Sequence, residues 1–449
     1  MRIACFFIAV FFGTHALVAQ QTVRLITLDP GHFHAALVQK SMYSQVDSVV
    51  YVYAKKGDDL QMHLDKINAY NFSNLSPTHW KETVYTGDDY LAKMLSEKKG
   101  NVVVLAGNNQ LKTDYILQSV QAGFHVFSDK PMVINEKGFK QLEKAFAIAE
   151  KKKLLLYDIM TERYEITTIL QRELSMQASV FGKLQNGTEA EPAVTKESVH
   201  HFYKYVSGAV LTRPAWFLDV EQEGEGIVDV TTHLVDLVQW ECFPGQVIDY
   251  KKDIQLSSAR SWGTLISKDR FTELTKLNTI PDYLNKYLDA QNNIQVLSNG
   301  EINYIIKGVH AKISVIWNYK APEGTGDTHY SIMRGTKSNL IIRQGAEQLY
   351  KPSLYIEPVI ASKEYEAELQ KVIEKIAKEY PGIRLQKNEK GWEVLIPEQF
   401  KEGHESHFAR VTEKYLGYLA NHSMPAWEVP NMLAKYYTTT QAQKMASKK

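Results

Sequence analysis

Short apolar runs alternate with longer amphipathic segments over the first 160 residues of the chain. The runs are rich in β-branched residues and predict strands at 23–28, 49–53, 83–86, 101–106, 125–128 and 154–157. Helices are predicted between them, at 34–42, 88–98, 113–122 and 139–152. Near-continuous apolar strands separated by helices are typical of a parallel sheet with helices on both faces. We therefore predict an α/β fold whose residues 20–160 form a Rossmann-type, doubly wound domain.

After residue 160 the pattern changes, and residues 161–449 are predicted to form a second, α+β domain. Helices are expected at 161–174 and 227–240, and residues 184–198 are expected to form a polar loop. Longer strand-like runs follow, at 293–297, 302–306, 311–317, 331–334 and 340–343. Asn299-Gly300 predicts a hairpin turn between the first two runs. Together these features predict a large, mainly antiparallel open sheet.

Residues 363–397 are interpreted as an addition to this second domain. An amphipathic helix is predicted at 363–380, followed by two short strands around 388–391. The chain is then expected to end in a helix at 408–419 and a polar tail.

The first 19 residues are interpreted as a secretory signal peptide, which is cut near Ala19. Arg2 precedes an apolar run at 3–12 that is shorter than the roughly 20 residues of a membrane-spanning helix. A periplasmic or secreted protein without a membrane span is therefore expected. Lys and Arg number 52 and Asp and Glu number 51, so the charge balance gives no reason to expect nucleic acid as a partner.

The turn after the first strand, at 29–34, is the place where a dinucleotide-binding fold has three glycines. Only Gly31 is present, and Asp29 and His34 stand at the two outer positions. A helix N-terminus at this turn still offers N–H groups to a phosphate, but Asp29 adds a negative charge beside it. The residues leave two readings open, a working cofactor site and a Rossmann-like domain whose site has decayed.

The tip of the second strand does not have the carboxylate that usually holds the cofactor's ribose. Lys55 and Lys56 stand there instead. These lysines either accept the 2′-phosphate of NADP or are solvated on a loop, so the choice between NAD and NADP stays open.

Two further segments are candidates for the chemistry. Asp129-Lys130-Pro131 follows the fifth strand directly, and ligands of open α/β sheets bind beyond the carboxyl ends of the strands. A proline in this position permits a cis peptide bond. On the predicted helix 227–240, Asp229 and His233 are four residues apart, so the carboxylate is expected to hold the imidazole in one tautomer.

These features, in this order and spacing, resemble the Gfo/Idh/MocA family of oxidoreductases over residues 23–343. Lys130 and Pro131 match the family's Glu-Lys-Pro motif, with Asp129 in place of the glutamate, and Asp229 and His233 match its helix motif. Asn108 fits the polar turn after the fourth strand, and Arg163 fits an arginine near the start of the second domain.

The resemblance implies a nicotinamide cofactor, NAD or NADP, and a small-molecule alcohol as substrate. His233 would accept the hydroxyl proton, Lys130 would stabilise the developing charge on oxygen, and Asp229 would orient His233. The expected cofactor contacts are at the strand ends and the turn: Asp29, Gly31, His32, Phe33, Lys55, Gly107, Asn108, Asp129, Lys130 and Arg163.

The segment after residue 350 resembles longer exported members of the family in Bacteroidetes, some of which act on sugars. The expected function is therefore an exported oxidoreductase with a tightly held cofactor, acting on a sugar, glycoside or polyol. Two alternatives stay open, a glycosidase or lyase that oxidises its substrate transiently and a sugar-binding protein without redox activity. A homodimer or homotetramer is expected by analogy.

Two groups of histidines complete the set of candidates. His200, His201 and Tyr203 are expected to contact the substrate together with Asp229 and His233. His404 and His407, with Glu405 between them, have no third ligand at a zinc-like spacing. No metal site is predicted.

Overall fold

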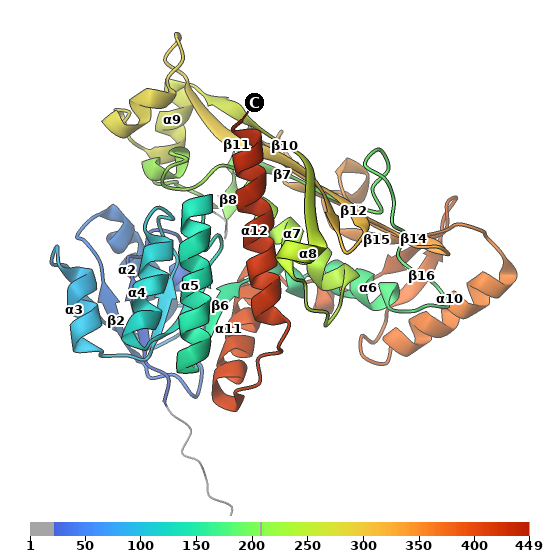
Figure 1. Cartoon of the computed structure of the whole chain (residues 1–449), viewed down its shortest axis with the longest axis horizontal. Helices are drawn as coiled ribbons and strands as arrows, with labels where there is room; N and C mark the ends of the chain where they lie inside the picture. Colours follow the sequence, from blue (N-terminus) through green and yellow to red (C-terminus); the bar gives the residue numbers. More distant parts are fainter. Residues whose placement is uncertain (1–21, 207–208, 449) are drawn as a thin grey trace, which may run out of the picture.

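The structure, a computed structural model, describes residues 22–206 and 209–448, and the signal peptide predicted at 1–19 lies outside them. The first domain contains a six-stranded sheet in the order β3-β2-β1-β4-β5-β6, and all its neighbouring strands are parallel (Figure 1). The strands are β1 (Leu25–Leu28), β2 (Val49–Tyr53), β3 (Lys81–Tyr85), β4 (Val102–Leu105), β5 (His125–Asp129) and β6 (Leu156–Ile159). The prediction of a Rossmann-type sheet is confirmed.

The helices of this domain agree with the predicted pattern except at its start. They are α1 (His34–Leu37), α2 (Asp58–Asn71), α3 (Tyr90–Glu97), α4 (Lys112–Ala122) and α5 (Glu136–Lys152). The helix predicted at 34–42 is only one turn long, and α2 was not predicted at all. Only Leu60, His63 and Ile67 of α2 are buried, which is too few apolar positions for a clear helical stripe.

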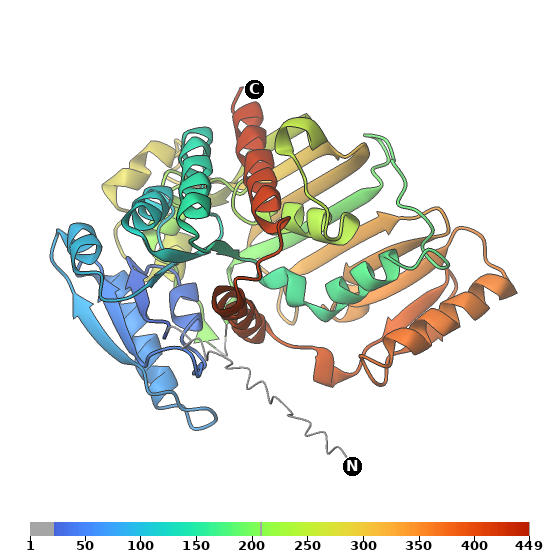
Figure 2. The same ribbon diagram turned by 60° about the horizontal axis from the view of Figure 1, so that its bottom comes forward.

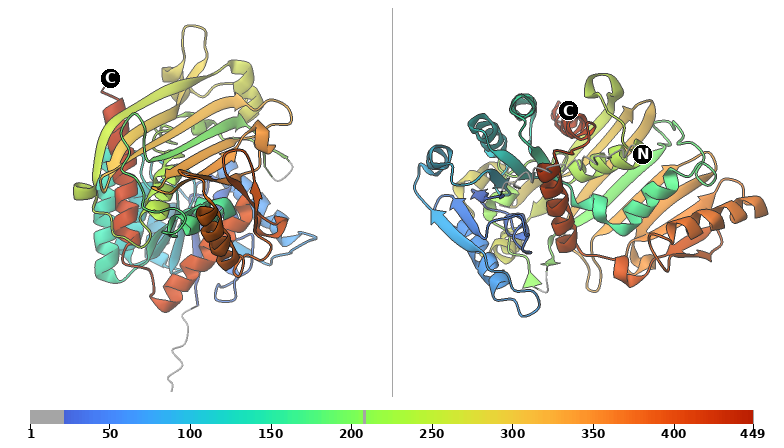
Figure 3. Two further views of the ribbon diagram at one scale, coloured as in Figure 1. Left: turned by 90° about the vertical axis from the view of Figure 1, so that its right-hand side faces the viewer. Right: turned by 90° about the horizontal axis from the view of Figure 1, so that it is seen from below.

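The second domain contains a nine-stranded sheet in the order β10-β11-β12-β7-β13-β14-β15-β17-β16. Only β7 and β12 are paired in parallel, so the predicted mainly antiparallel sheet is confirmed. Helices α6 (Ile166–Ser175) and α7 (Thr231–Cys242) pack against this sheet (Figures 2 and 3). The strands are β7 (Val194–Tyr203), β10 (Ile254–Ile266), β11 (Ile294–Ile306), β12 (Val309–Lys320), β13 (Thr328–Arg334), β14 (Ser338–Gln344), β15 (Ser353–Pro358), β16 (Arg384–Lys387) and β17 (Trp392–Leu395).

The hairpin predicted at Asn299-Gly300 is wrong, because both residues lie within the continuous strand β11. The turn to β12 comes later, at Gly308, whose φ of 81° is in the left-handed region. Gly300 has another use: a Cβ there would lie 2.7 Å from the Cα of Ile227. The Asn299 side chain accepts a hydrogen bond from the backbone N–H of Trp317. Gly300 therefore lets the segment at Ile227 approach the sheet closely.

Residues 363–397 form the predicted addition. Helix α10 (Lys363–Ile376) is followed by β16 and β17, and these two strands extend one edge of the large sheet. By contrast, β7 occupies the last third of the predicted loop at 184–198, and the prediction of a loop there is wrong beyond residue 193. Strand β7 lies in the interior of the sheet, between β12 and β13.

The end of the chain is not a polar tail but a second long helix. Helix α11 (His404–Asn421) leads to α12 (Glu428–Ala446), which lies between α5 and the large sheet (Figures 1 and 2). The ring of Tyr415 in α11 stacks on Phe127 of β5, at 4.4 Å between ring centroids. Residues after 160 are therefore not confined to the second domain, because α11 and α12 return and complete the core of the first domain.

Among the helices in the described part of the chain, none has an apolar stretch long enough to cross a membrane.

Candidate active site

A cavity of about 930 Å³ opens beyond the carboxyl end of β5, against residues of the second domain. Lys130, Asp229 and His233 all line it, although about a hundred residues separate the lysine from the histidine in the chain. The first domain contributes residues at the ends of β1 and β5, and the second domain contributes β7, α7 and the 321–327 loop. The cavity thus has the position expected for ligands of an open α/β sheet.

Lys130 follows β5, and the peptide bond between Lys130 and Pro131 is cis. Its ammonium Nζ forms an ion pair with Asp229. Burial opposes the charge on Lys130, but the carboxylates of Asp229 and Asp129 outweigh this effect and raise its pKa. The lysine is therefore a fixed positive charge on the cavity wall, and its ammonium group can donate hydrogen bonds to a ligand.

His233 lies in the first turn of α7, and burial, followed by the positive charge of Lys130, holds its pKa well below the ordinary value. The imidazole is therefore neutral at neutral pH. Its Nδ1 atom is buried without a hydrogen-bond partner. Buried polar atoms are normally satisfied, so this nitrogen is available to a group that enters the cavity.

Asp229 does not orient His233 as expected from the four-residue spacing. Helix α7 begins at Thr231, so Asp229 lies in the turn before the helix, outside the helical ladder that was predicted at 227–240. Its carboxylate accepts a hydrogen bond from Lys130 instead. Lys130, Asp229 and His233 therefore line one cavity as predicted, but Asp229 pairs with Lys130 and not with His233 as expected.

The candidate substrate residues His200, His201 and Tyr203 lie on β7 and line the same cavity. The His200 ring stacks on Trp317, at 5.1 Å between ring centroids, and its Nε2 lies 2.7 Å from the hydroxyl of Ser198. His201 Nδ1 lies 2.9 Å from Asp327 Oδ1. This part of the cavity therefore presents ring faces together with hydrogen-bonding groups.

The cavity contains charged residues that the sequence did not single out. Glu223 lies on its wall, and burial followed by the nearby Asp229 charge raises the Glu223 pKa well above its ordinary value. Burial also raises the pKa of Glu162 to about 7 and lowers that of Arg213 to about 10. Glu223 lies next to the glycine-containing entry to α7, the one signal that could have suggested it.

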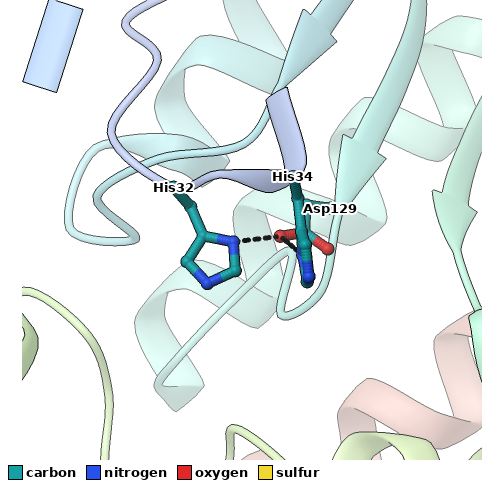
Figure 4. Close-up of side chains that lie close together, drawn as sticks. All are labelled: His32, His34 and Asp129. Carbon is teal, nitrogen blue, oxygen red and sulfur yellow. Dashed lines mark hydrogen bonds and ion pairs between the residues drawn. The ribbon is translucent and has the colours of Figure 1, made fainter. Parts of the chain in front are cut away.

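The turn at 29–34 adopts a tight conformation at the end of β1. Asp29 has a φ of 49°, a value typical of glycine, and a Cβ on Gly107 would lie 2.4 Å from the Asp29 carbonyl oxygen. His32 and His34 both face the carboxylate of Asp129 (Figure 4). Phe33 also lines the cavity. The turn is therefore held close to the strand ends, where a cofactor's phosphates lie in Rossmann folds.

The cavity, which would hold the nicotinamide of a dinucleotide cofactor, fits its ligand better than the turn at 29–34, which would hold the diphosphate. The open cavity with Lys130 and His233 offers space and hydrogen bonds for a nicotinamide and an alcohol. At the turn, however, the indole of Trp216 donates a hydrogen bond to Asp59, and the amide of Asn108 donates one to Gln222. These contacts between the domains must open before a diphosphate can reach Gly31.

Of the ten predicted cofactor residues, three line the cavity: His32, Phe33 and Lys130. Lys55 and Arg163 do not line it. Lys55 is exposed on the loop after β2. Arg163 is buried, and its guanidinium donates hydrogen bonds to Asp236 at 2.6 and 2.7 Å and to Glu428 at 3.1 Å. All three of its nitrogen atoms are used within the protein, so Arg163 joins α7 to α12 rather than facing a ligand.

Comparison with known proteins gives the same two-domain division. Residues 30–158 match the family described as "Oxidoreductase family, NAD-binding Rossmann fold", and residues 170–447 match the "Putative oxidoreductase C terminal domain". No protein of curated function matches the chain.

The solved structures include a "putative oxidoreductase" from Parabacteroides merdae that is 56% identical, with a TM-score of 0.93. The match covers 96% of this chain and 98% of that one. A 3-ketoreductase from Actinomadura kijaniata, in complex with TDP-benzene and NADP, is 12% identical with a TM-score of 0.54, over 94% and 97% of the two chains. Biliverdin reductase from Synechocystis, with biliverdin and NADP+, is 11% identical with a TM-score of 0.56, over 95% and 99%. The last two likenesses concern the fold alone.

The family assignment rests on both domains. The C-terminal match covers more than half of the chain, and the Parabacteroides protein is similar over almost its whole length. The first domain has the strand order and the NAD-binding description of a dinucleotide-binding fold. The chain therefore belongs to the Gfo/Idh/MocA family of NAD(P)-dependent oxidoreductases.

Proposed function

We propose that this protein transfers hydride between a tightly held nicotinamide cofactor and a carbon that bears a hydroxyl group in a sugar, glycoside or polyol. The observation that carries the proposal is that Lys130 and His233 line one cavity. Hydride transfer from an alcohol needs a group that stabilises charge on oxygen and a group that takes the hydroxyl proton, and these two side chains have those properties.

The cofactor, when bound, supplies the hydride chemistry, and the protein supplies position, charge and proton transfer. The Nζ of Lys130 donates a hydrogen bond to the substrate oxygen and stabilises the charge that develops there. A neutral imidazole nitrogen of His233 accepts the hydroxyl proton. Burial, followed by the charge of Lys130, holds the pKa of His233 well below the ordinary value, so the imidazole is neutral before the reaction and releases the accepted proton to solvent through the cavity.

The lining of the cavity favours a substrate with several hydroxyl groups. Lys204, Arg213 and Asp327 add charged donors and acceptors to the histidines of β7. Trp317 supplies an aromatic ring within the same wall. A polar wall with a ring face is well suited to a carbohydrate, whose hydroxyls need partners and whose C–H face stacks on aromatic rings.

Export of the protein is part of the proposal and is supported by the apolar segment at 3–12. A cofactor outside the cytoplasm has no reliable free pool, so it must stay bound and be regenerated by a second substrate or by re-reduction of the first. The test is fractionation of the native host, together with N-terminal sequencing of the mature chain. Export predicts a mature N-terminus near Gln20, and an uncut chain in the cytoplasm would refute it.

The decisive experiment denatures the purified protein and identifies any released dinucleotide by absorbance and mass spectrometry. Sugars and polyols are then screened for a substrate that changes the absorbance of the bound nicotinamide. His233→Asn and Lys130→Met should retain the dinucleotide and lose the change, whereas His79→Asn, at an exposed histidine, should retain both. Absence of released dinucleotide and failure to bind added NAD or NADP would reject the proposal.

A second candidate is a carbohydrate-binding protein without redox activity. It is favoured by Asp29 and Asp59 at the phosphate turn, and by the Trp216 contact that closes it. This candidate predicts that sugar binding is measurable by calorimetry without any dinucleotide and survives in the Lys130 and His233 variants. Turnover that those variants abolish would exclude it.

A further inference from the structure

Two histidines and an aspartate form a compact cluster where the first domain meets the cavity. His32 and His34 belong to the turn after β1, and Asp129 is the last residue of β5. His34 Nδ1 lies 2.8 Å from Asp129 Oδ2, and His32 Nδ1 lies 3.6 Å from the same oxygen. Figure 4 shows both rings turned toward this carboxylate. The two imidazole rings lie against each other, at 4.0 Å between their centroids.

We propose that His32, His34 and Asp129 bind a divalent transition-metal ion such as Zn²⁺. One potential ligand atom from each residue lies within 4.8 Å of the others. Two imidazole nitrogens and one carboxylate oxygen form a donor set typical of zinc and of non-haem iron. From the sequence, the candidate metal ligands were His404, Glu405 and His407, and no metal site was predicted.

The distances in the cluster are close to those that a metal ion requires. Ligand atoms at about 2.0–2.2 Å from a tetrahedral ion lie about 3.3–3.6 Å from one another. The His32–Asp129 distance of 3.6 Å is already at this spacing. The shorter His34–Asp129 distance must open by about half an ångström. Rotation of a carboxylate about its terminal torsion, which is broad, is enough for such a change.

The hydrogen bonding within the cluster is incomplete without a ligand. The Nδ1 atom of His32 is buried and has no hydrogen-bond partner, because 3.6 Å to the carboxylate is too long for a hydrogen bond. Asp129 is buried too, and its Oδ2 is the atom that faces both rings. A cation between the three side chains would satisfy the free nitrogen and use the carboxylate charge.

The fourth coordination position faces the cavity. His32, His34 and His404 all line the cavity, and the His404 ring centroid lies 5.1 Å from that of His34. Three protein ligands with one open position are typical of catalytic metal sites, in which water or a substrate oxygen completes the shell.

The surrounding charges set a limit on the affinity. Lys112 and Lys130 lie near the cluster and repel a cation, whereas Asp229 and Glu223 face the same lysines and partly neutralise them. The two opposing sets of charges favour reversible binding over a permanently occupied structural site. The proposal does not rest on the proposed hydride transfer, because the ligands and the test are independent of a dinucleotide.

The experiment measures metal binding directly. Full-length mature protein is treated with a chelator, dialysed and titrated with Zn²⁺ in a calorimeter. Co²⁺ is added in parallel, because its visible absorption reports tetrahedral coordination. We expect one ion per chain. His32→Ala and Asp129→Asn should each weaken binding by more than about 100-fold, since loss of even an outer-shell partner typically costs 10–100-fold.

His79→Ala, at an exposed histidine in the same domain, is the matched control and should bind as the original protein does. His32 is the preferred variant because its side chain is 22% exposed, so its removal leaves the core packed. Far-UV circular dichroism and thermal melts verify folding. The proposal is overturned if the original protein binds no ion, or if folded His32→Ala and Asp129→Asn bind it unchanged. Dinucleotide release, measured separately, keeps this outcome distinct from the proposed function.

Discussion

Two ion networks start from the same short segment of sequence and have different roles. Asp229, before α7, pairs with Lys130 on the wall of the cavity. Asp236, seven residues later, pairs with Arg163 and Lys435 in the interior. The second network continues from Arg163 to Glu428 and from Lys435 to Asp158, and all of its members are buried.

The two networks differ in their surroundings, namely in whether buried polar atoms nearby have hydrogen-bond partners. In the interior network, Arg163 and Lys435 each contact two carboxylates. Beside the cavity pair, by contrast, the His233 Nδ1 and the His32 Nδ1 are buried without partners. Charge pairs that satisfy one another join elements, whereas unsatisfied polar atoms facing a cavity await a ligand. The following variants test this distinction, beginning with the largest expected effect.

Replacing His233 by Asn should reduce turnover by about 10²–10⁴-fold, the usual contribution of a general acid or base. Stability should change little, because no hydrogen bond of His233 Nδ1 is lost. The measurement is single-turnover reduction of the bound nicotinamide by the substrate found in the screen. The distinction between the two networks would be contradicted if the variant turned over at the original rate, or if it unfolded as readily as a variant of the interior network.

Replacing Lys435 by Met should destabilise the fold by about 3–5 kcal/mol, because the buried carboxylates of Asp236 and Asp158 lose their cation. Urea denaturation measures this effect. Lys444→Met is the matched control, since Lys444 lies on the same helix α12 but pairs with Glu136 at the surface, so its loss should have a much smaller effect. Similar midpoints for the two variants would contradict the structural role of the interior network.

The interior network also predicts how the stability of the fold depends on pH. Burial opposes the charge of Asp236, but Arg163 and Lys435 outweigh this and hold its pKa well below the ordinary value. A carboxyl with a lowered pKa stabilises the fold above its unfolded-state pKa, about 3.9, and this contribution is lost as the pH falls through the folded value. The contribution of Asp236 should therefore be fully present at neutral and mildly acidic pH.

The sequence predicted most of the first domain because the four strands β1, β4, β5 and β6 are buried almost throughout and most of them appear as apolar runs. It failed for α12, whose buried face is largely polar. Thr438 and Thr440 there bond to backbone carbonyls of their own helix, and Lys435 is buried through its ion pairs. A helix that buries polar groups has no apolar stripe, so periodicity alone does not indicate that it is buried.

The residues of the candidate site were predicted better than the contacts between them. Lys130, Asp229 and His233 line one cavity, as the motif spacing suggested. The predicted partner of Asp229 was wrong because α7 starts two residues after Asp229. Arg163 was expected at the cofactor but binds Asp236 and Glu428, and Glu428 lies in the very helix that the pattern missed. Contacts between distant segments depend on packing that local patterns do not contain.

Replacing Lys130 by Met should reduce turnover by about 10²–10³-fold, the cost of removing one donor that stabilises charge on oxygen. The substrate's binding constant should change less than the rate, because the charge develops in the transition state. Lys130→Arg retains the charge and should recover part of the loss. Rapid-mixing measurements on both variants provide the comparison. Equal rates in Lys130→Met and the original protein would show that this pair, like the interior one, is only structural.

The smallest effect concerns the phosphate turn, where Asp59 bonds to the Trp216 indole. Burial, with the nearby charge of Asp29 adding to it, raises the Asp59 pKa to about 6. Below that pH Asp59 is neutral, and above it a second carboxylate repels the diphosphate. Binding of NAD, whose diphosphate does not titrate in this range, should therefore weaken about three- to tenfold between about pH 5 and pH 7.

Asp59→Asn should remove this pH dependence while its amide oxygen still accepts the hydrogen bond from Trp216. Asp65→Asn, at an exposed position on the same helix α2, should leave the dependence unchanged. Calorimetric titration with NAD across this pH range distinguishes the two. If Asp59→Asn keeps the slope, the carboxylate does not face the diphosphate. The domain contact at Trp216 would then act as a steric closure of the turn, and Trp216→Ala should speed NAD binding at every pH.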